Sequence, residues 1–344
     1  MHSPAAPDTT EILADLNEAQ LAAVTHIKGP LLVVAGAGSG KTRVLTRRIA
    51  YILASRDEEG RPLAYPSQIL AITFTNKAAA EMRERVEQIV GPDARRMWVM
   101  TFHSACGRIL RKEAERLGFT SNFTIYDQGD QVRLVKQCIE SLDLDVKRFI
   151  PANVHHQISD AKNRLISTTE YRSSVDSFLQ ETIADIYDLY ETRLKASNAM
   201  DFDDMIFKVV TLLESDEEVR KHWQARFHYV LVDEYQDTNH AQYRLLRALA
   251  GAHNNICCVG DADQSIYSWR GADIRNITSF EDDYPDATVV VLDVNYRSTG
   301  HILEAANGII SNNSQRIKKD LKSIFGDGHQ VEVLEVDDEH AEAR

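Results

Sequence analysis

The sequence holds 344 residues, of which 43% are hydrophobic and 26% charged, a profile typical of a soluble globular protein with two domains or one enlarged domain. Its net charge of −13 argues mildly against a general polyanion-binding role, although global charge says little about a single groove. No apolar run approaches the ~20 residues of a membrane helix and no signal-peptide pattern opens the chain, so we expect a cytoplasmic protein without membrane contact.

Short β-branched runs alternate with helical patterns along the chain. Several of these runs are continuously apolar, which suits strands that helices cover on both faces. The pattern therefore predicts an α/β fold built on a parallel sheet. The expected strands are Leu31–Ala35, Ile69–Phe74, Trp98–Phe102, Tyr229–Asp233, Ile256–Gly260, Val289–Leu292 and Val331–Val336.

A glycine-rich turn follows the first strand and leads into an amphipathic helix. Glycines let the backbone curl so that its N–H groups point at phosphate oxygens, and the helix N-terminus adds its dipole. In such a loop Lys41 reaches the β- and γ-phosphates, and the Thr42 hydroxyl helps hold Mg²⁺. The pattern predicts that the chain binds a nucleoside triphosphate. The loop residues are Ala35, Gly36, Ala37, Gly38, Ser39 and Gly40.

The hydrophobic pattern of the sequence changes between roughly 107 and 199, where apolar residues recur at helical spacing and charged residues occupy the other faces. We expect a mostly helical insertion there, with the sheet resuming near Tyr229. Four cysteines (Cys106, Cys138, Cys257 and Cys258) show no metal-ligand spacing and are expected to be buried reduced thiols.

Asp233 and Glu234 stand at the end of a predicted strand, at the sheet edge that faces ligands in nucleotide-binding α/β folds. An Asp in this position holds Mg²⁺, and the adjacent Glu orients and deprotonates the attacking water. The pair therefore favours hydrolysis of ATP over transfer of its phosphate to a metabolite.

Another set of polar and aromatic residues follows the strand at Ile256–Gly260. Gln264 is placed to hydrogen-bond the γ-phosphate. Tyr267 and Trp269 are expected on one face of an extended segment beside Arg270, an arrangement suited to stacking on unpaired bases. The alternative is that both rings belong to the core.

Together these runs resemble the UvrD/PcrA/Rep group of superfamily 1 helicases, over the chain from Leu16 to about Asn307. The resemblance makes Ala35 the ordinary first residue of the loop. It implies that Gln20, in LNEAQ, contacts the adenine edge and that Arg43 lies near the nucleotide. In NYRS, it implies that Tyr296 stacks on the adenine and that Arg297 contacts the γ-phosphate.

The same resemblance implies a path for single-stranded DNA. ITFTNKAAAEMRER and TFHS are similar to the family's first DNA-contacting motifs, and MDFDDM places a ring in the strand path. The triad Asp201, Asp203 and Asp204 otherwise suggests a metal cluster, but helix capping is the favoured interpretation. The implied DNA contacts are Phe74, Thr75, Asn76, Thr101, Phe102, His103, Phe202, Tyr267, Trp269 and Arg270.

The family implies RecA-like motor domains with ATP between them. We expect residues 1–107 and 201–285 to form the first motor domain, 108–200 its helical accessory insertion, and 286–344 the start of a second motor domain. The expected activity is DNA-stimulated ATP hydrolysis with 3′-to-5′ movement along single-stranded DNA. The expected partners are single-stranded DNA, duplex junctions and proteins of DNA repair or replication.

The later family motifs are absent, so we expect a fragment of a longer helicase, or a truncated gene, that binds ATP but hydrolyses it poorly without its C-terminal half. Three alternatives stay open. They are a nucleotide-gated single-stranded DNA-binding module without turnover, the motor part of a helicase–nuclease, and a small-molecule kinase. DNA would not affect the ATP use of such a kinase.

Overall fold

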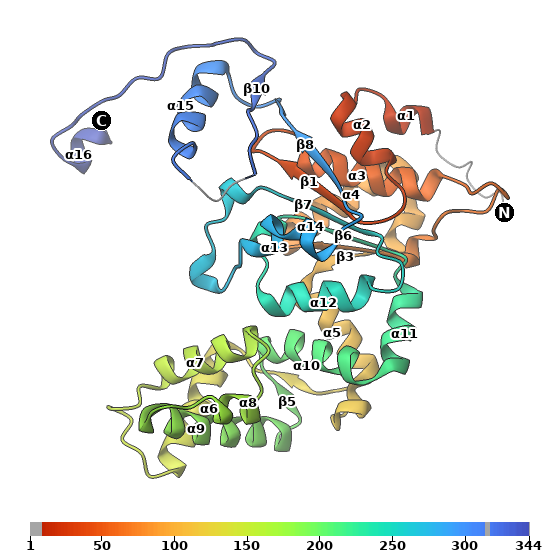
Figure 1. Cartoon of the computed structure of the whole chain (residues 1–344). Coiled ribbons are helices and arrows are strands. Elements are labelled where there is room, and N and C mark those ends of the chain that lie inside the picture. The colour runs from red at the N-terminus through yellow and green to blue at the C-terminus, as the bar shows by residue number, and fades with distance from the viewer. Residues whose placement is uncertain (1–8, 314–316, 344) are drawn as a thin grey trace.

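The computed structural model describes residues 9–313 and 317–343. Its centre is a six-stranded sheet in which every neighbouring pair of strands is parallel, and helices cover both faces (Figure 1). Across the sheet the strands are β3 (Trp98–Thr101), β2 (Ile69–Thr73), β6 (Tyr229–Val232), β7 (Ile256–Gly260), β1 (Leu31–Ala35) and β8 (Thr288–Leu292). The predicted parallel α/β sheet is confirmed.

The sheet separates two apolar cores. Every residue of β1 and β7 is buried, as expected for strands covered on both faces. One core lies under α2 (Glu18–Thr25), α3 (Lys41–Ala54) and α4 (Asn76–Val90). The opposite core lies under α5 (Phe102–Glu113), α10 (Phe202–Ser215), α11 (Glu217–Arg226) and α12 (His240–Ala250).

The four cysteines are buried and free, as predicted. Cys257 and Cys258 follow each other on β7 and point into opposite cores, because side chains alternate along a strand. Within the described residues, no helix is both long enough and apolar enough to cross a membrane.

The insertion has a core of its own. The helices of the insertion are α6 (Gln128–Ser141), α7 (Pro151–Asn163), α8 (Thr168–Ser173) and α9 (Phe178–Ala196), shown at the bottom of Figure 1. Two short parallel strands, β4 (Thr124–Ile125) and β5 (Ala199–Met200), pair where the chain leaves and returns. The predicted boundary at 107/108 is too early, because α5 runs through it and buries Ile109 and Leu110 in the core of the main sheet.

The strand predicted at Val289–Leu292 does not open a second sheet. It is part of β8, which pairs with β1 and forms the edge of the first sheet. After it, β9 (Val294–Asn295) pairs with β10 (Lys322–Ser323), and α15 (Gly300–Ile310) connects them. The remaining helices are α1 (Thr9–Leu13), α13 (Arg275–Thr278), α14 (Phe280–Asp283) and α16 (Glu339–Glu342).

The strand predicted at Val331–Val336 is wrong. The segment has no regular structure, and its apolar side chains are exposed, Val333 to 92%. Its backbone forms no hydrogen bond with any other described segment, and a strand persists only when a neighbour satisfies its backbone groups.

Candidate functional site

The glycine-rich loop lies at the C-terminal edge of the sheet, between β1 and α3. Gly38 and Gly40 have φ values of 74° and 92°, a left-handed conformation that favours glycine. Ser39 is buried and donates from Oγ to the Gly36 carbonyl at 2.8 Å, which tightens the loop. Among the described residues no side chain caps the N-terminus of α3, so its first N–H groups remain available to an anion.

Lys41, the first residue of α3, points across the sheet edge to Glu234. Its Nζ lies 2.8 Å from Glu234 Oε2, and the two side chains are 12% and 38% exposed. Glu234 has φ 49° and ψ 46°, a conformation that is strained for a residue with a side chain and is typical of functional positions. The two chemically reactive groups predicted from separate motifs are therefore direct partners.

Asp233 completes the acidic end of β6. Burial and the neighbouring Glu234 carboxylate raise the pKa of Asp233 to about 6. Such a carboxylate is stabilised by a nearby cation, and carboxylate and hydroxyl oxygens are the ligands that Mg²⁺ prefers. Asp233 and Thr42, the second residue of α3, therefore fit the predicted metal role.

Gln236, which the sequence pattern did not single out, connects this site to the next strand. Its Nε2 donates to Glu234 Oε2 at 3.1 Å, and its Oε1 accepts from the Asp261 N–H at 2.9 Å. Asp261 in turn accepts from Gln264 Nε2 at 2.6 Å and pairs with Lys319. Gln264 therefore faces Asp261 rather than the glycine-rich loop. The only sequence signal for Gln236 is its place two residues after Glu234.

The segment after β8 lies directly on the glycine-rich loop. The Tyr296 N–H donates to the Gly38 carbonyl at 2.8 Å, and Asn295 Nδ2 donates to the Ala37 carbonyl at 2.6 Å. A Cβ atom at Gly38 would come within 2.6 Å of Arg297 Cβ, so only glycine permits this approach. The predicted γ-phosphate contact, Arg297, is thereby brought beside the loop.

The predicted adenine contacts, Gln20 and Tyr296, both form a hydrogen bond with Asn17. Asn17 Nδ2 donates to the Tyr296 hydroxyl at 2.8 Å. Gln20 is fully buried and donates from Nε2 to the Ser39 carbonyl at 3.1 Å, so in this structure its amide holds the loop. Arg43, in the first turn of α3, donates to the Asp15 carbonyl at 2.8 Å.

A cavity of about 570 Å³ adjoins the acidic site. Glu234 and Gln264 line it together with several residues of the predicted DNA path, so the candidate hydrolytic group and the candidate stacking rings border one cavity. The predicted DNA residues in its wall are Phe74, Thr75, His103, Phe202, Tyr267 and Arg270. We call this hollow the strand groove.

Exposed rings border the strand groove. Phe202 is 50% exposed, and its ring centroid lies 4.4 Å from that of His103. Burial lowers the pKa of His103, so the ring stays neutral at pH 7. Trp269 does not line the strand groove, but it is 68% exposed, which rules out the alternative that it belongs to the core.

The segment that carries Tyr267 and Trp269 is not extended as predicted. Ser268–Arg270 forms a 3₁₀ turn that ends at Gly271, whose φ is 83°. The turn brings the rings to a centroid distance of 6.3 Å, and the Arg270 guanidinium lies 4.5 Å from the Trp269 ring centroid. Gly271 accounts for the difference, because its left-handed conformation closes a tight turn.

One predicted DNA contact is wrong. Phe102 is 2% exposed and packs edge-on against Phe74, because it begins α5 on the face that covers the sheet. Thr101 caps the same helix, and its hydroxyl accepts from the Ser104 N–H at 3.3 Å. Asn76 is exposed at the start of α4 but does not line the strand groove.

Two residues of the acidic triad near Phe202, Asp201 and Asp204, form a capping box at the start of α10, as favoured from the sequence. Asp201 caps α10, where its side chain accepts from the Asp204 N–H at 2.7 Å. Asp203 accepts from Asn163 Nδ2 at 2.9 Å, and Asn163 lines the strand groove.

Comparison with known proteins identifies two family models. The UvrD/REP helicase N-terminal domain matches residues 16–285, and the UvrD-like helicase C-terminal domain matches residues 290–344. The chain is 47% identical over 336 residues to the ATP-dependent DNA helicase PcrA of Bacillus subtilis, covering 98% of the chain and 45% of that relative. It is 50% identical over 353 residues to the ATP-dependent DNA helicase UvrD1 of Mycobacterium tuberculosis, covering 99% of the chain and 45% of that relative. The chain thus spans about half the length of the curated relatives it matches.

Proposed function

The chain belongs to the UvrD/REP helicase family, and on that premise we propose that it carries the ATP-hydrolysing site of a helicase that moves 3′ to 5′ along single-stranded DNA. One observation carries the proposal. Glu234 pairs with Lys41 of the glycine-rich loop and also lines the strand groove with Tyr267 and Phe74. A group that touches both sites is suited to couple hydrolysis to a bound strand.

In the proposed division of labour, the six-stranded unit is the first motor domain and the helical insertion its accessory domain. The segment from β9 onward begins the second motor domain. Asn295 and Arg297 meet the glycine-rich loop from that segment, which supports a nucleotide held between the two. Loss of the γ-phosphate would then loosen their contact.

The chemistry follows from the residues at the sheet edge. The loop N–H groups and Lys41 hold phosphate oxygens, which compete with Glu234 for the ammonium group. Glu234, once released, accepts the proton of the attacking water. Mg²⁺ held by Thr42 and Asp233 would neutralise phosphate charge. Gln236 and Asp261 link Glu234 to Gln264 at the wall of the strand groove.

The proposal is tested by measuring Mg-ATP hydrolysis with and without oligothymidylate, for the chain and for Glu234→Gln. We expect DNA to raise turnover and the substitution to lower it by about 10²–10⁴-fold, because a general base is removed. Nucleotide affinity should persist. Glu181→Gln, an exposed carboxylate on α9, is the matched control and should hydrolyse ATP normally.

An ATP hydrolysis rate that changes neither with DNA nor with Glu234→Gln would refute the proposal and favour a small-molecule kinase. Binding of ATP and DNA without turnover would favour the nucleotide-gated binding module. The direction of movement is a separate matter, checked by the displacement of a label from either end of a single strand.

A further inference from the structure

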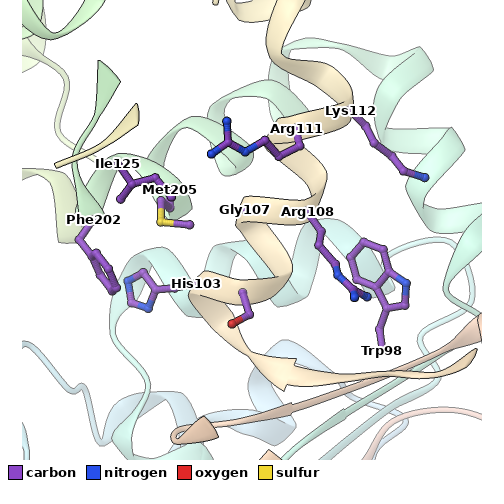
Figure 2. A pocket seen from close by; sticks show the side chains of 10 residues that line it. Trp98, His103, Gly107, Arg108, Arg111, Lys112, Ile125, Phe202 and Met205 are labelled. Atoms are coloured by element: carbon purple, nitrogen blue, oxygen red, sulfur yellow. The ribbon is translucent and has the colours of Figure 1, made fainter. Parts of the chain in front are cut away.

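A second groove continues from the strand groove along the outer face of α5. It has a volume of about 740 Å³ and shares His103 and Phe202 with the strand groove, so this ring pair lies between the two cavities. Figure 2 shows the groove running from Phe202 and His103, past Gly107, to Trp98. We call it the α5 groove.

The cations of the α5 groove lack acidic partners. Arg108, Arg111 and Lys112 line it from neighbouring positions of α5, and none forms an ion pair with any carboxylate in the described part of the chain. Glu113, the nearest acid in sequence, accepts from Trp223 Nε1 at 3.1 Å and lies 3.7 Å from Arg116. In a chain of net charge −13, three cations without an ion pair to any described carboxylate form a local field that attracts anions.

Arg108 and Lys112 are held in place without being neutralised. The Arg108 guanidinium lies 5.2 Å from the Trp98 ring centroid, and Lys112 Nζ lies 5.6 Å from that of Trp223. Both side chains are exposed, so their N–H groups remain open to a ligand. Arg111 differs, because it donates to the Ser121 and Phe123 carbonyls at 2.6 and 2.7 Å and fixes the loop before the insertion.

The floor of the α5 groove suits a chain with apolar as well as charged parts. Gly107 lies inside α5, where glycine costs about 1 kcal/mol relative to alanine. A Cβ atom there would come within 2.9 Å of Met205 Cε, so the glycine lets Met205 approach the helix. Ile125 and Met205 provide an apolar wall opposite the cations.

We propose that the α5 groove binds the same single-stranded polynucleotide after it passes the His103–Phe202 pair. Arg108 and Lys112 hold its phosphates, and the wall of Ile125 and Met205 contacts its bases and sugars. The continuity with a ring pair that accepts unpaired bases favours a single strand over a duplex. The inference rests on the proposed function and extends the binding site by several nucleotides.

The test is equilibrium binding of oligothymidylates of increasing length to Arg108→Gln/Lys112→Gln at several salt concentrations. Short oligonucleotides, which fill the strand groove alone, should bind as they do to the unsubstituted chain. Long ones should bind roughly 10-fold more weakly, and the slope of log affinity against log salt should fall by about 1.4, because two phosphate contacts are removed. Arg133→Gln/Lys136→Gln on α6 removes the same charge elsewhere and should change neither quantity.

The charge-retaining variant Arg108→Lys/Lys112→Arg should recover the affinity for long oligonucleotides, which a general disturbance of α5 would not allow. An unchanged affinity at every length would overturn the α5 groove while leaving the proposed function intact. An equal loss at every length would also overturn it, because the two cations would then act through the fold or the strand groove. If the unsubstituted chain binds no oligonucleotide, the proposed function itself fails.

Discussion

Lys162 and Lys41 both contact carboxylates, but they differ in burial and in the number of carboxylates that each contacts. On α7 of the helical insertion, Lys162 is 1% exposed, and its Nζ lies 2.5, 2.6 and 2.9 Å from oxygens of Glu191, Asp201 and Asp204. At the sheet edge, Lys41 contacts one carboxylate within the described residues, that of the partly exposed Glu234. A saturated buried cluster stabilises one geometry, whereas a single open pair is free to exchange partners.

The Lys162 cluster also shows why acidic residues alone are poor evidence for a metal. Oxygens of Glu191, Asp201 and Asp204 lie within 4.8 Å of one another, a spacing that would suit an ion. The Lys162 ammonium group contacts all three carboxylates and occupies the position that a metal ion would take. Although burial alone would raise it, Lys162 and Lys208 hold the pKa of Asp204 below its ordinary value.

The largest expected effect comes from breaking the buried cluster. Lys162→Met keeps the side-chain length but leaves three carboxylates without their shared cation. We expect the free energy of unfolding to fall by about 3–5 kcal/mol, measured by urea denaturation. Lys136→Met, an exposed cation on α6, should change it by less than about 0.5 kcal/mol. If Lys162→Met lowers the free energy of unfolding by less than about 1 kcal/mol, Lys162 and Lys41 do not differ in structural importance.

A smaller effect, of opposite sign, is expected at the open site. The pKa of Asp233 is raised to about 6, so its ionised form destabilises the fold above that pH. Asp233→Asn should therefore raise the free energy of unfolding at pH 8 by at most about 3 kcal/mol, because a difference of one between the folded and unfolded pKa values corresponds to about 1.4 kcal/mol. The gain should shrink as the pH falls through about 6 and vanish below about 4.

Asp216→Asn is the control for that pH profile. A hydrogen bond from the Val219 N–H and the contact with Arg116 hold the pKa of Asp216 below its ordinary value. The substitution should lower stability at neutral pH and lose its effect in acid. A gain at pH 8 for both variants would mean that a general reduction of negative charge, and not the burial of Asp233, is responsible.

The smallest stability effect is expected for Lys41→Met. Because Glu234 is 38% exposed, water screens the ion pair, and its loss should change the free energy of unfolding by less than about 1 kcal/mol. Affinity for a nucleoside triphosphate should nevertheless fall sharply, as measured by fluorescent-nucleotide titration. A stability loss near that of Lys162→Met would show that Lys41 is structural and would weaken its proposed phosphate role.

Much of the sheet could be predicted from the sequence because its signals are local. β1 and β7 begin and end where their apolar runs do, and the glycine-rich loop is recognisable within a few residues. The acidic pair at Asp233 and Glu234 follows directly from the end of β6. Periodicity and turn chemistry suffice for features of this kind.

Features that depend on distant partners could not be predicted in this way. An apolar run does not say which sheet it joins. The prediction did not anticipate that β8 pairs with β1, and the run at Val331–Val336 has no strand partner among the described residues. Phe102 stands between the predicted DNA contacts Thr101 and His103 in sequence, but the face of α5 on which it lies buries it.

The sequence by itself determined the strands β1 and β7, the phosphate-binding loop and the acidic pair, because each depends on residues within one turn or one strand. Only the tertiary structure decided which lysine is structural and which is open, since Lys162 meets Asp201 across 39 residues and Lys41 meets Glu234 across 193. Burial and the number of partners set the role of a charge, and both arise only when the chain is packed.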